Sequence, residues 1–259
     1  MPTFKISDLP DKTKTMHYTQ ARWRKKNWND SLKNHSNDLE KLLSLIELFD
    51  IWKNRLPKND AIKFLSREIY ADAYMSIHLA CFGLYKNGYM SLRSQFETAM
   101  RLIYFSTHPL EFKLWMSGDE KWIKNLLKGP DVWGYEFTYF AFIPEIKKLE
   151  SLSPKKLRLI SQSDTTPKLR DIYSKLSKHV HSGGPFLQTR SGRLSAKYSQ
   201  DEFSSWCEMF KDIQKYINIL FALCFPDEFK KMPHPEMDQI LNLAIGPDYK
   251  DLVKEACGL

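Results

Sequence analysis

The chain has 259 residues, of which 42% are hydrophobic and 14% aromatic, and it carries a formal net charge of +8 at pH 7. This composition excludes a disordered chain and is typical of a globular protein with a core of its own. The first residues lack the apolar segment of a signal peptide, and no apolar run approaches the roughly 20 residues of a membrane span. We therefore expect a cytoplasmic protein without membrane contact.

The N-terminal segment, residues 1–30, is predicted to be a basic and aromatic arm. The first 34 residues hold eight basic and three acidic side chains, a net charge of +5. Such a segment favours a phosphate backbone or another acidic surface, and aromatic rings among cations can stack on exposed bases. The same rings could instead hold a loose arm against its own domain. The aromatic residues are Tyr18, Trp23 and Trp28, and the bases among them are Arg22, Arg24, Lys25 and Lys26.

Residues 31–225 are expected to form one domain, an all-α antiparallel helical bundle. Apolar side chains that recur every three or four residues predict a first helix from about Ser31 or Ser36 to Arg55. A second helix should run from Asp60, as its N-cap, to a stop at Asn87–Gly88, and a third from Tyr89 to Thr107. His78 in the second helix is expected to be a hydrogen-bonded core residue.

The third helix carries a candidate site at Arg93 and Glu97, beside its apolar stripe. An ion pair surrounded by apolar groups loses solvation, so it normally has further partners. A surface pair at this spacing stabilises a helix by only about 0.2 to 0.5 kcal/mol, and Arg before Glu is the weaker order. The two residues therefore belong either to a functional site or to a structural buried ion pair.

Between the third helix and the next long one the pattern is irregular. Residues 109–128 predict two short helical pieces. Residues 131–165 mix aromatic residues with two prolines and are predicted to be a variable helical insertion.

A helix with two histidines is predicted to begin at Thr166 and Pro167 and to stop at residues 182–185. Its apolar stripe must face a core, with His181 along one edge and His179 along the opposite edge. A histidine at the border between core and solvent is suited to proton transfer. The stripe consists of Leu169, Ile172, Tyr173, Leu176 and Val180, and Arg170 and Ser177 share the edge of His181.

The loop that follows, residues 182–198, is predicted to be flexible and cationic and to hold a nucleic-acid backbone through Arg190, Arg193 and Lys197. A capping box, Ser199-x-x-Glu202, then predicts a long helix that ends at about Cys224. Residues 226–259 are expected to be a C-terminal extension of the same domain, with two short helices at 240–245 and 249–257.

Several reaction classes lack their sequence signatures. The chain has no Walker loop, dinucleotide-binding glycine motif, nucleophile elbow, H-E-x-x-H, Glu-x-x-His or zinc-type Cys/His spacing. Its four cysteines lie far apart and are expected to be reduced thiols. What remains is acid/base chemistry by histidine, helped by cations, with no metal and no cofactor. On RNA this chemistry is feasible, because the 2′-hydroxyl can attack the adjacent phosphate once a base removes its proton.

Two motifs, Arg93-x-x-x-Glu97 and Tyr173-x-x-Leu176-Ser177-x-x-Val180-His181, together with Gly88, resemble those of a bacterial helical family of uncharacterised proteins related to the HEPN (higher eukaryotes and prokaryotes nucleotide-binding) superfamily. The resemblance covers residues 67–183. It implies an antiparallel helical bundle, homodimerisation and, in many members, metal-independent RNase activity in toxin–antitoxin or antiphage systems. The superfamily's usual Arg-x(4–6)-His is missing here, since only Lys175 has a suitable separation from His181, and Arg93 is a candidate to supply the guanidinium from the neighbouring helix.

Two functions are therefore expected. The first is a HEPN-like ribonuclease effector that acts on RNA and is paired with an antitoxin or another defence-system partner. In it, His181 is the general acid/base, Arg93 or Lys175 stabilises phosphate charge, and Glu97 orients these groups. The second is a non-catalytic helical binding or scaffold protein in which a buried hydrogen-bond network joins two helices. The candidate catalytic residues are His181, Arg93, Glu97, Ser177, Tyr173 and Lys175, and all of these except Lys175 would form the network.

Overall fold

The computed structural model describes residues 10–118, 143–152, 168–180 and 197–259, and every regular element in these ranges is helical. The all-α prediction is therefore confirmed for the described part of the chain. The elements are α1 (Asp11–Arg55), α2 (Asp60–Cys81), α3 (Tyr85–Thr107), α4 (Pro109–Met116), α7 (Pro144–Leu152), α8 (Lys168–Val180), α9 (Gln200–Cys224), α10 (Pro226–Lys230), α11 (His234–Gln239), the π-helix η3 (Ile240–Ile245) and α12 (Lys250–Cys257).

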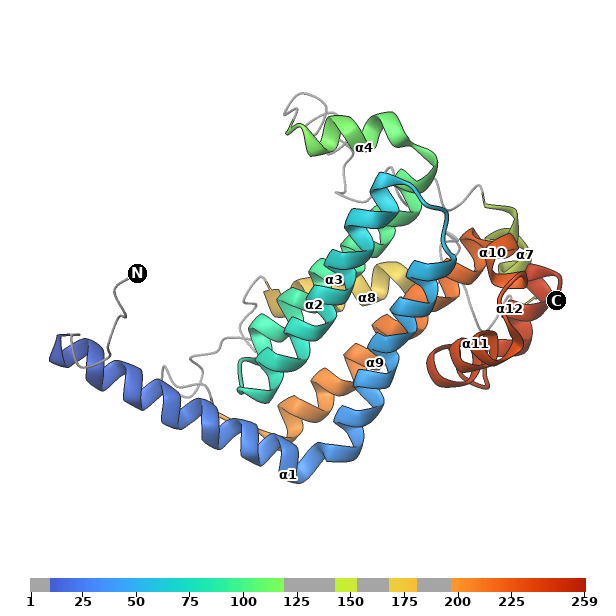
Figure 1. Ribbon diagram of the computed structural model, residues 1–259. Coiled ribbons are helices and arrows are strands. Elements are labelled where there is room, and N and C mark those ends of the chain that lie inside the picture. Colours follow the sequence, from blue (N-terminus) through green and yellow to red (C-terminus); the bar gives the residue numbers. More distant parts are fainter. Residues whose placement is uncertain (1–9, 119–142, 153–167, 181–196) are drawn as a thin grey trace.

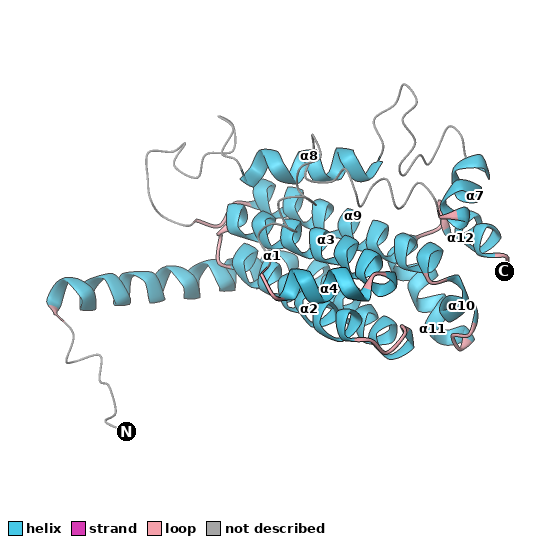
Figure 2. Cartoon of the chain, turned by 90° about the horizontal axis from the view of Figure 1, so that it is seen from above, coloured by secondary structure: helices cyan, strands magenta, loops and turns pink. Residues whose placement is uncertain are grey.

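The long helices form a bundle in which α2 runs opposite to the second half of α1, to α3 and to α9 (Figure 1). The second half of α1 runs alongside α9, and α2 and α3 form an antiparallel hairpin against them (Figure 1). Seen from above, α8 lies along one face of the bundle over α3 (Figure 2). The short elements α7, α10, α11 and α12 gather where α9 ends (Figure 1). The antiparallel bundle expected from the sequence is present in the neighbouring pairs α1/α2 and α2/α3, while α9 runs parallel to α1 and α3 (Figure 1).

Helix α9 lies at the centre of this bundle. It contacts α1, α3, α7, α10, α12 and η3, and its aromatic side chains Phe203, Trp206 and Phe210 are fully buried. Two buried amides interrupt its apolar faces, and both are paired. Asn218 accepts a hydrogen bond of 2.8 Å from the indole of Trp52 on α1, and Gln214 exchanges hydrogen bonds with Gln95 on α3. The N-cap half of the capping box predicted at the start of α9 is confirmed, because the Ser199 side chain accepts from the amide of Glu202. The Ser199 amide donates to the hydroxyl of Tyr85 on α3.

The first helix begins about 20 residues earlier than the sequence pattern predicts. Instead of starting at Ser31 or Ser36, α1 starts at Asp11, and its residues 15–26 are all exposed. This segment is rich in good helix formers and has neither Pro nor Gly, so it is helical without packing. The expected start misses it because an apolar period arises only where a helix faces a core. We call residues 11–34 of α1 the arm helix; it projects away from the bundle (Figure 1).

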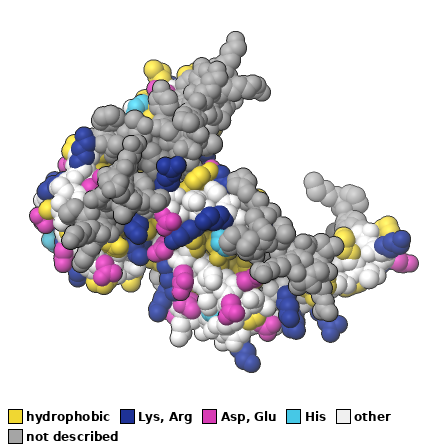
Figure 3. Space-filling model, turned by 180° about the vertical axis from the view of Figure 1, so that it is seen from behind, with side chains coloured by type: hydrophobic (Ala, Val, Ile, Leu, Met, Phe, Trp, Pro, Cys, Tyr) yellow, Lys and Arg dark blue, Asp and Glu magenta, His cyan; other side chains and the backbone are white. Residues whose placement is uncertain are grey.

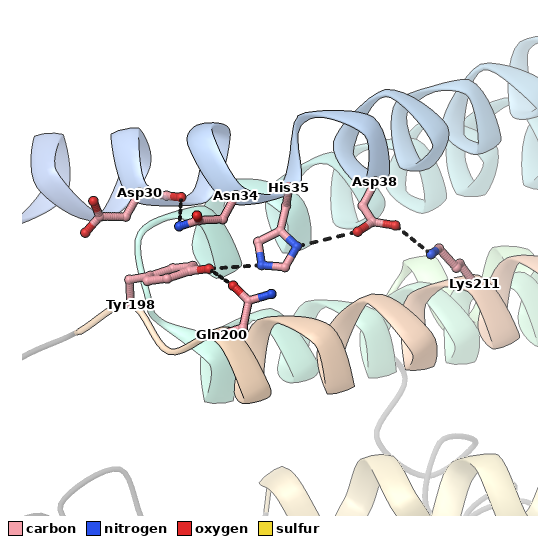
Figure 4. A network of polar contacts seen from close by, with 7 residues as sticks. All are labelled: Asp30, Asn34, His35, Asp38, Tyr198, Gln200 and Lys211. Atoms are coloured by element: carbon pink, nitrogen blue, oxygen red, sulfur yellow. Dashed lines mark hydrogen bonds and ion pairs between the residues drawn. The ribbon is translucent and has the colours of Figure 1, made fainter.

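A kink at His35 separates the arm helix from the packed half of α1. The backbone there has φ −136° and ψ 24°, and no Pro or Gly is present to cause it. The buried His35 ring stacks on Phe203 with 4.2 Å between centroids, and its Nε2 lies 3.0 Å from the hydroxyl of Tyr198. One turn later Asp38 accepts a hydrogen bond of 3.0 Å from Lys211 on α9, and this bond lowers the pKa of the Asp38 carboxyl (Figure 4). The kink is thus held by side chains of α9 and of the residues just before it.

The turn between α2 and α3 differs from the predicted one. The second helix ends at Cys81 rather than at Asn87–Gly88, and Gly88 lies inside α3. There the Ser76 hydroxyl donates to the Gly88 carbonyl at 2.8 Å and accepts from the indole of Trp206 at 3.0 Å. A Cβ at Gly88 would lie 3.2 Å from that indole nitrogen, so this glycine permits close packing instead of ending a helix.

Two details of α2 also correct the prediction. Its N-cap is Asn59, whose side chain accepts from the amide of Ile62, and Asp60 is the first helical residue. His78 is only half-buried, and its ring contacts Trp28, Tyr74 and Phe82 rather than lying in the core.

Elsewhere the described elements agree with the expected ones as far as they extend. Helix α4 is the first of the two short pieces predicted for residues 109–128, and the second lies outside the described residues. Of the predicted insertion, residues 131–165, only residues 143–152 are described, and they include α7. Both short helices expected near the C-terminus are present, as η3 and α12, and they are preceded by α10 and α11, which the sequence pattern does not predict.

Gly83, in the turn between α2 and α3, brings three chain segments together. Its φ is +74°, and a Cβ there would lie 2.8 Å from the carbonyl carbon of Lys197 and 3.1 Å from the side-chain nitrogen of Asn27. That Asn27 nitrogen donates to the carbonyl of Phe82 at 2.8 Å, and its oxygen accepts from the amide of Tyr198. The base of the arm helix is therefore fixed to this turn and to the segment before α9.

We expect Gly83→Ala to lower the free energy of unfolding by about 2 to 4 kcal/mol, because it adds left-handed strain and a backbone clash. Gly246→Ala is the matched control. Gly246 has φ +80°, and no described atom lies within 4 Å of the point that its Cβ would occupy, so only the strain of about 1 to 2 kcal/mol applies there. Urea unfolding followed by circular dichroism measures both changes. Equal losses in the two variants would contradict the close approach at Gly83.

Candidate functional site

The two helices that carry the sequence motifs meet at Arg93. Its Nε donates to Glu97 Oε1 at 2.8 Å within α3, and one of its terminal nitrogens donates to the hydroxyl of Tyr173 on α8. The guanidinium carbon also lies 4.7 Å from the centre of the Tyr173 ring, within the range of a cation–π contact. Arg93 thus binds α8 through both the hydroxyl and the ring of one tyrosine.

Glu97 lies between two arginines. Arg101, one turn further along α3, approaches Glu97 Oε2 at 3.5 Å, while Arg93 holds the other oxygen. Arg93 and Glu97 are each 18% exposed and Arg101 is 30% exposed, so the group lies at the edge of the bundle. The predicted further partners of the Arg93–Glu97 pair are confirmed as Arg101 and Tyr173. We call these four residues the Arg93 cluster; with two cations and one carboxylate, it carries a net positive charge.

A second contact between α3 and α8 lies one turn away, at Tyr89. Its ring stacks on that of His179 with 3.7 Å between centroids and 14° between planes. The pairs Arg93–Tyr173 and Tyr89–His179 show that the two helices run in opposite directions. Burial lowers the pKa of His179, so its imidazole is neutral at pH 7. His179 lies on the edge of α8 opposite to the one predicted for His181, and this edge is therefore packed against α3.

The apolar stripe predicted for α8 is confirmed, because Leu169, Ile172 and Leu176 are buried. Ser177 lies one turn after Tyr173, and its hydroxyl oxygen is buried with no hydrogen-bond partner among the described residues. Lys175 is on the solvent side, where it forms an ion pair of 2.9 Å with Asp171 and is 52% exposed. The structure therefore brings Tyr173 to Arg93 and leaves Lys175 away from both.

Three predicted site residues, His181, Arg190 and Arg193, lie outside the described residues. The predicted meeting of His181 with Arg93 stays a prediction. Arg93 contacts α8 at Tyr173, seven residues before the helix ends at Val180, which is a rise of about 10 Å along the axis. A direct contact would therefore need the chain after Val180 to turn back toward Arg93.

The remaining predicted nucleic-acid-binding residues are all exposed. Lys197 lies just before α9, and four bases lie on the arm helix, on which dark blue side chains are seen from behind (Figure 3). These four are Arg22, Arg24, Lys25 and Lys26.

The sequence pattern assigns no site role to three residues that the structure places in this region. Arg101 follows Glu97 by four residues, which is the favourable order for a helical ion pair, so the spacing alone could have identified it. The stack of Tyr89 on His179 depends on how α8 crosses α3, and no spacing within either helix predicts it.

Thiol chemistry is disfavoured at the described cysteines, which are all free. Burial raises the pKa of Cys81, Cys207 and Cys257 to about 12, so these thiols stay protonated and are weak nucleophiles at neutral pH. Within the ranges that the structure describes, no three His, Cys, Asp or Glu side chains gather to hold a metal ion. Among the described helices, none combines the length and apolar character needed to cross a bilayer.

Comparison with known proteins adds no relative: no protein-family model matches the chain, and neither the curated proteins nor the solved structures searched gave a match.

We expect Tyr173→Phe to lower the free energy of unfolding by about 1 to 2 kcal/mol, because the Arg93 guanidinium loses a hydrogen-bond acceptor while the ring remains. A double-mutant cycle with Arg93→Gln should give a coupling energy above about 0.5 kcal/mol. Urea unfolding of the four proteins measures it. Strictly additive losses would show that the contact does not join α3 to α8.

Acid should weaken the packing of α8. Because burial lowers the pKa of His179 in the folded state, the unfolded chain binds a proton first once the pH falls below about 6.5. The free energy of unfolding should then decline as the pH falls, until the folded protein is protonated as well. His179→Phe keeps an aromatic ring and cannot titrate, so its stability should decline less between pH 7.5 and 5. Parallel pH profiles of the two proteins would contradict this role of His179.

Proposed function

We propose that the protein is a HEPN-like nucleic-acid-acting protein, a metal-independent ribonuclease that serves as an effector or toxin in a bacterial defence or toxin–antitoxin system. The observation that supports this most directly is the contact between Arg93 and Tyr173, which joins the two helices carrying the resembling motifs. In the sequence Arg93 and Tyr173 are 80 residues apart, and in the fold they meet in the interface between α3 and α8, which we call the seam. Membership of the superfamily rests on the motifs themselves.

The proposed chemistry uses the RNA strand's own 2′-hydroxyl as nucleophile. His181 removes its proton and later protonates the leaving 5′-oxygen, so that the phosphodiester is broken without a metal ion. The net positive Arg93 cluster lies between α3 and α8 and offers charge that favours a phosphate group undergoing attack. Glu97 holds the guanidinium in place. Lys175 is the weaker candidate for the cation, since it pairs with Asp171 on the solvent side of α8.

Binding of the RNA backbone is assigned to exposed bases outside this seam. The arm helix and the segment before α9 both present such cations, and the described ones are Arg22, Arg24, Lys25, Lys26 and Lys197. Arg190 and Arg193 complete the proposed set. Affinity that arises from phosphate contacts should fall steeply with salt. As partners we propose a second copy of the chain and, in a toxin–antitoxin setting, a neutralising protein.

A second candidate function is a non-catalytic helical binding or scaffold protein. It is favoured by the way Arg93 is held, since Glu97 and Tyr173 both engage its guanidinium and all three residues link α3 to α8. In that case the cluster stabilises the bundle and binds no substrate.

Replacement of His181 separates the two functions. If the protein is a ribonuclease, His181→Ala should unfold at the wild-type temperature and lose RNA cleavage, measured by sequencing new RNA ends in cells that express each variant. His234→Ala, at an exposed histidine on α11, is the control and should cleave normally. If the protein is a scaffold, His181→Ala should lower the melting temperature by several degrees. Unchanged cleavage would exclude His181 as the acid/base residue.

A further inference from the structure

The outer face of α2 is unusually aromatic for a solvated helix. Tyr70 and Tyr74 are 39% and 44% exposed, and Phe64 and Met75 on the same helix are 44% and 52% exposed. These side chains contribute little to the core, whose members on α2 lie on the opposite face. Exposed apolar side chains that lie together, unlike ones scattered singly, mark an interaction surface.

The rings on this face form a connected series. Tyr70 and Tyr74, one turn apart, have nearly parallel planes, with 7° between them and 6.5 Å between centroids. Tyr74 then meets His78 edge-on at 4.7 Å, and His78 stacks on Trp28 of α1 with 5.6 Å between centroids. We call Tyr70, Tyr74, His78 and Trp28 the aromatic ladder. It runs along α2 and crosses to the base of the arm helix.

Cations are placed at both ends of the aromatic ladder. Arg24 and Lys25 precede Trp28 by four and three residues, so they lie on its side of the arm helix and are exposed. Arg67 precedes Tyr70 by three residues on α2 and is also exposed. Two more exposed aromatic residues, Tyr18 and Trp23, follow along the arm. The surface thus alternates flat rings with positive charge over α2 and the arm helix, which run in different directions (Figure 1).

Charge selects among the possible occupants. Residues 11–26 carry six bases and one acidic side chain, so the arm that continues this surface has a net charge of +5. A second copy of the same surface would bring like charges together, whereas a polyanion would be attracted. Stacking requires base faces that are open, and a duplex hides them between neighbouring base pairs. Rings flanked by cations are the arrangement by which proteins hold unpaired strands.

We propose that the aromatic ladder and the adjoining basic side chains of the arm helix bind single-stranded nucleic acid. Nucleobases stack on Tyr70 and Tyr74, and phosphates are held by Arg67, Arg24 and Lys25. This surface lies on α1 and α2, whereas the Arg93 cluster lies on α3 and α8, so the two share no residue. As a statement about substrate it rests on the proposed function, since it specifies that the RNA is unpaired where the protein holds it. As a binding site it stands without catalysis.

The test measures binding alone, with His181→Ala as the background so that any cleavage is removed. A fluorescein-labelled 15-nucleotide single-stranded RNA and the corresponding duplex are titrated at fixed salt, and anisotropy gives the two affinities. We expect Tyr70→Ala/Tyr74→Ala to weaken binding of the single strand about tenfold or more, because each stacked base contributes about 1 to 3 kcal/mol. Tyr70→Phe/Tyr74→Phe keeps both rings and should bind nearly as the parent does.

The control is Leu110→Ala/Leu114→Ala, which removes two exposed side chains one turn apart on α4 and should leave affinity unchanged. Circular dichroism checks that each variant is folded.

The proposal is overturned if the double alanine variant binds the strand like its parent, or if the duplex binds as tightly as the single strand. It is also overturned if the protein binds vesicles of anionic lipid but not the RNA, or if the tyrosine pair changes only self-association. Loss of cleavage by His181→Ala with binding intact would leave this site standing, while failure of cleavage in the wild type would count against the proposed function alone.

Discussion

The burial of the C-terminal half of α9 on nearly all of its faces is the constraint that orders the rest of the fold. A helix that is covered all round cannot leave its polar side chains without partners, because an unpaired buried amide costs about 1 to 3 kcal/mol. Asn218 and Gln214 therefore determine which residues of α1 and α3 face them, namely Trp52 and Gln95. Both α1 and α3 run parallel to α9, and α2 runs in the opposite direction and packs on both α1 and α3 (Figure 1). The short C-terminal helices then cover the end of α9 that the bundle leaves open.

The seam between α3 and α8 depends on this order. Because Gly88 lets α3 approach Trp206 on α9, the opposite side of α3 faces outward and presents Tyr89, Arg93 and Glu97 to α8. The interface between α3 and α8 has the neutral stacked pair Tyr89–His179 at one end and the charged Arg93 cluster at the other. Helix α8 is short and touches mainly α3, so these few side chains largely decide how it sits. The motif residues are thus also the residues that hold α8 in place, which is why structural and catalytic roles need separate measurements.

Periodic patterns predict the packed helices of this chain and fail where packing is absent or unusually close. The stripe of α8 and the Ser199 N-cap of α9 follow from spacing alone, and so does the apolar face of α2. The arm helix shows no apolar period because it faces water, so its helical character has to come from propensity. The sequence pattern predicts Gly88 to end a helix. A sequence alone does not distinguish such a glycine from one inside a helix that lets an aromatic side chain, here Trp206, pack closely. The partner of Arg93 is also beyond local patterns, since Tyr173 lies 80 residues further along the chain.

Among the described residues, the arm helix is held at its base. Its contacts with the turn at Gly83 and with the segment before α9 involve Asn27, Ser31 and His35, and residues 11–26 extend beyond them as a rod of about 24 Å. A rod of that length amplifies small rotations, so a change of roughly 10° at its base would move its tip by about 4 Å. The polar groups at the base of the arm helix therefore set its orientation, and with it the distance that a flexible ligand must span between the tip and the bundle.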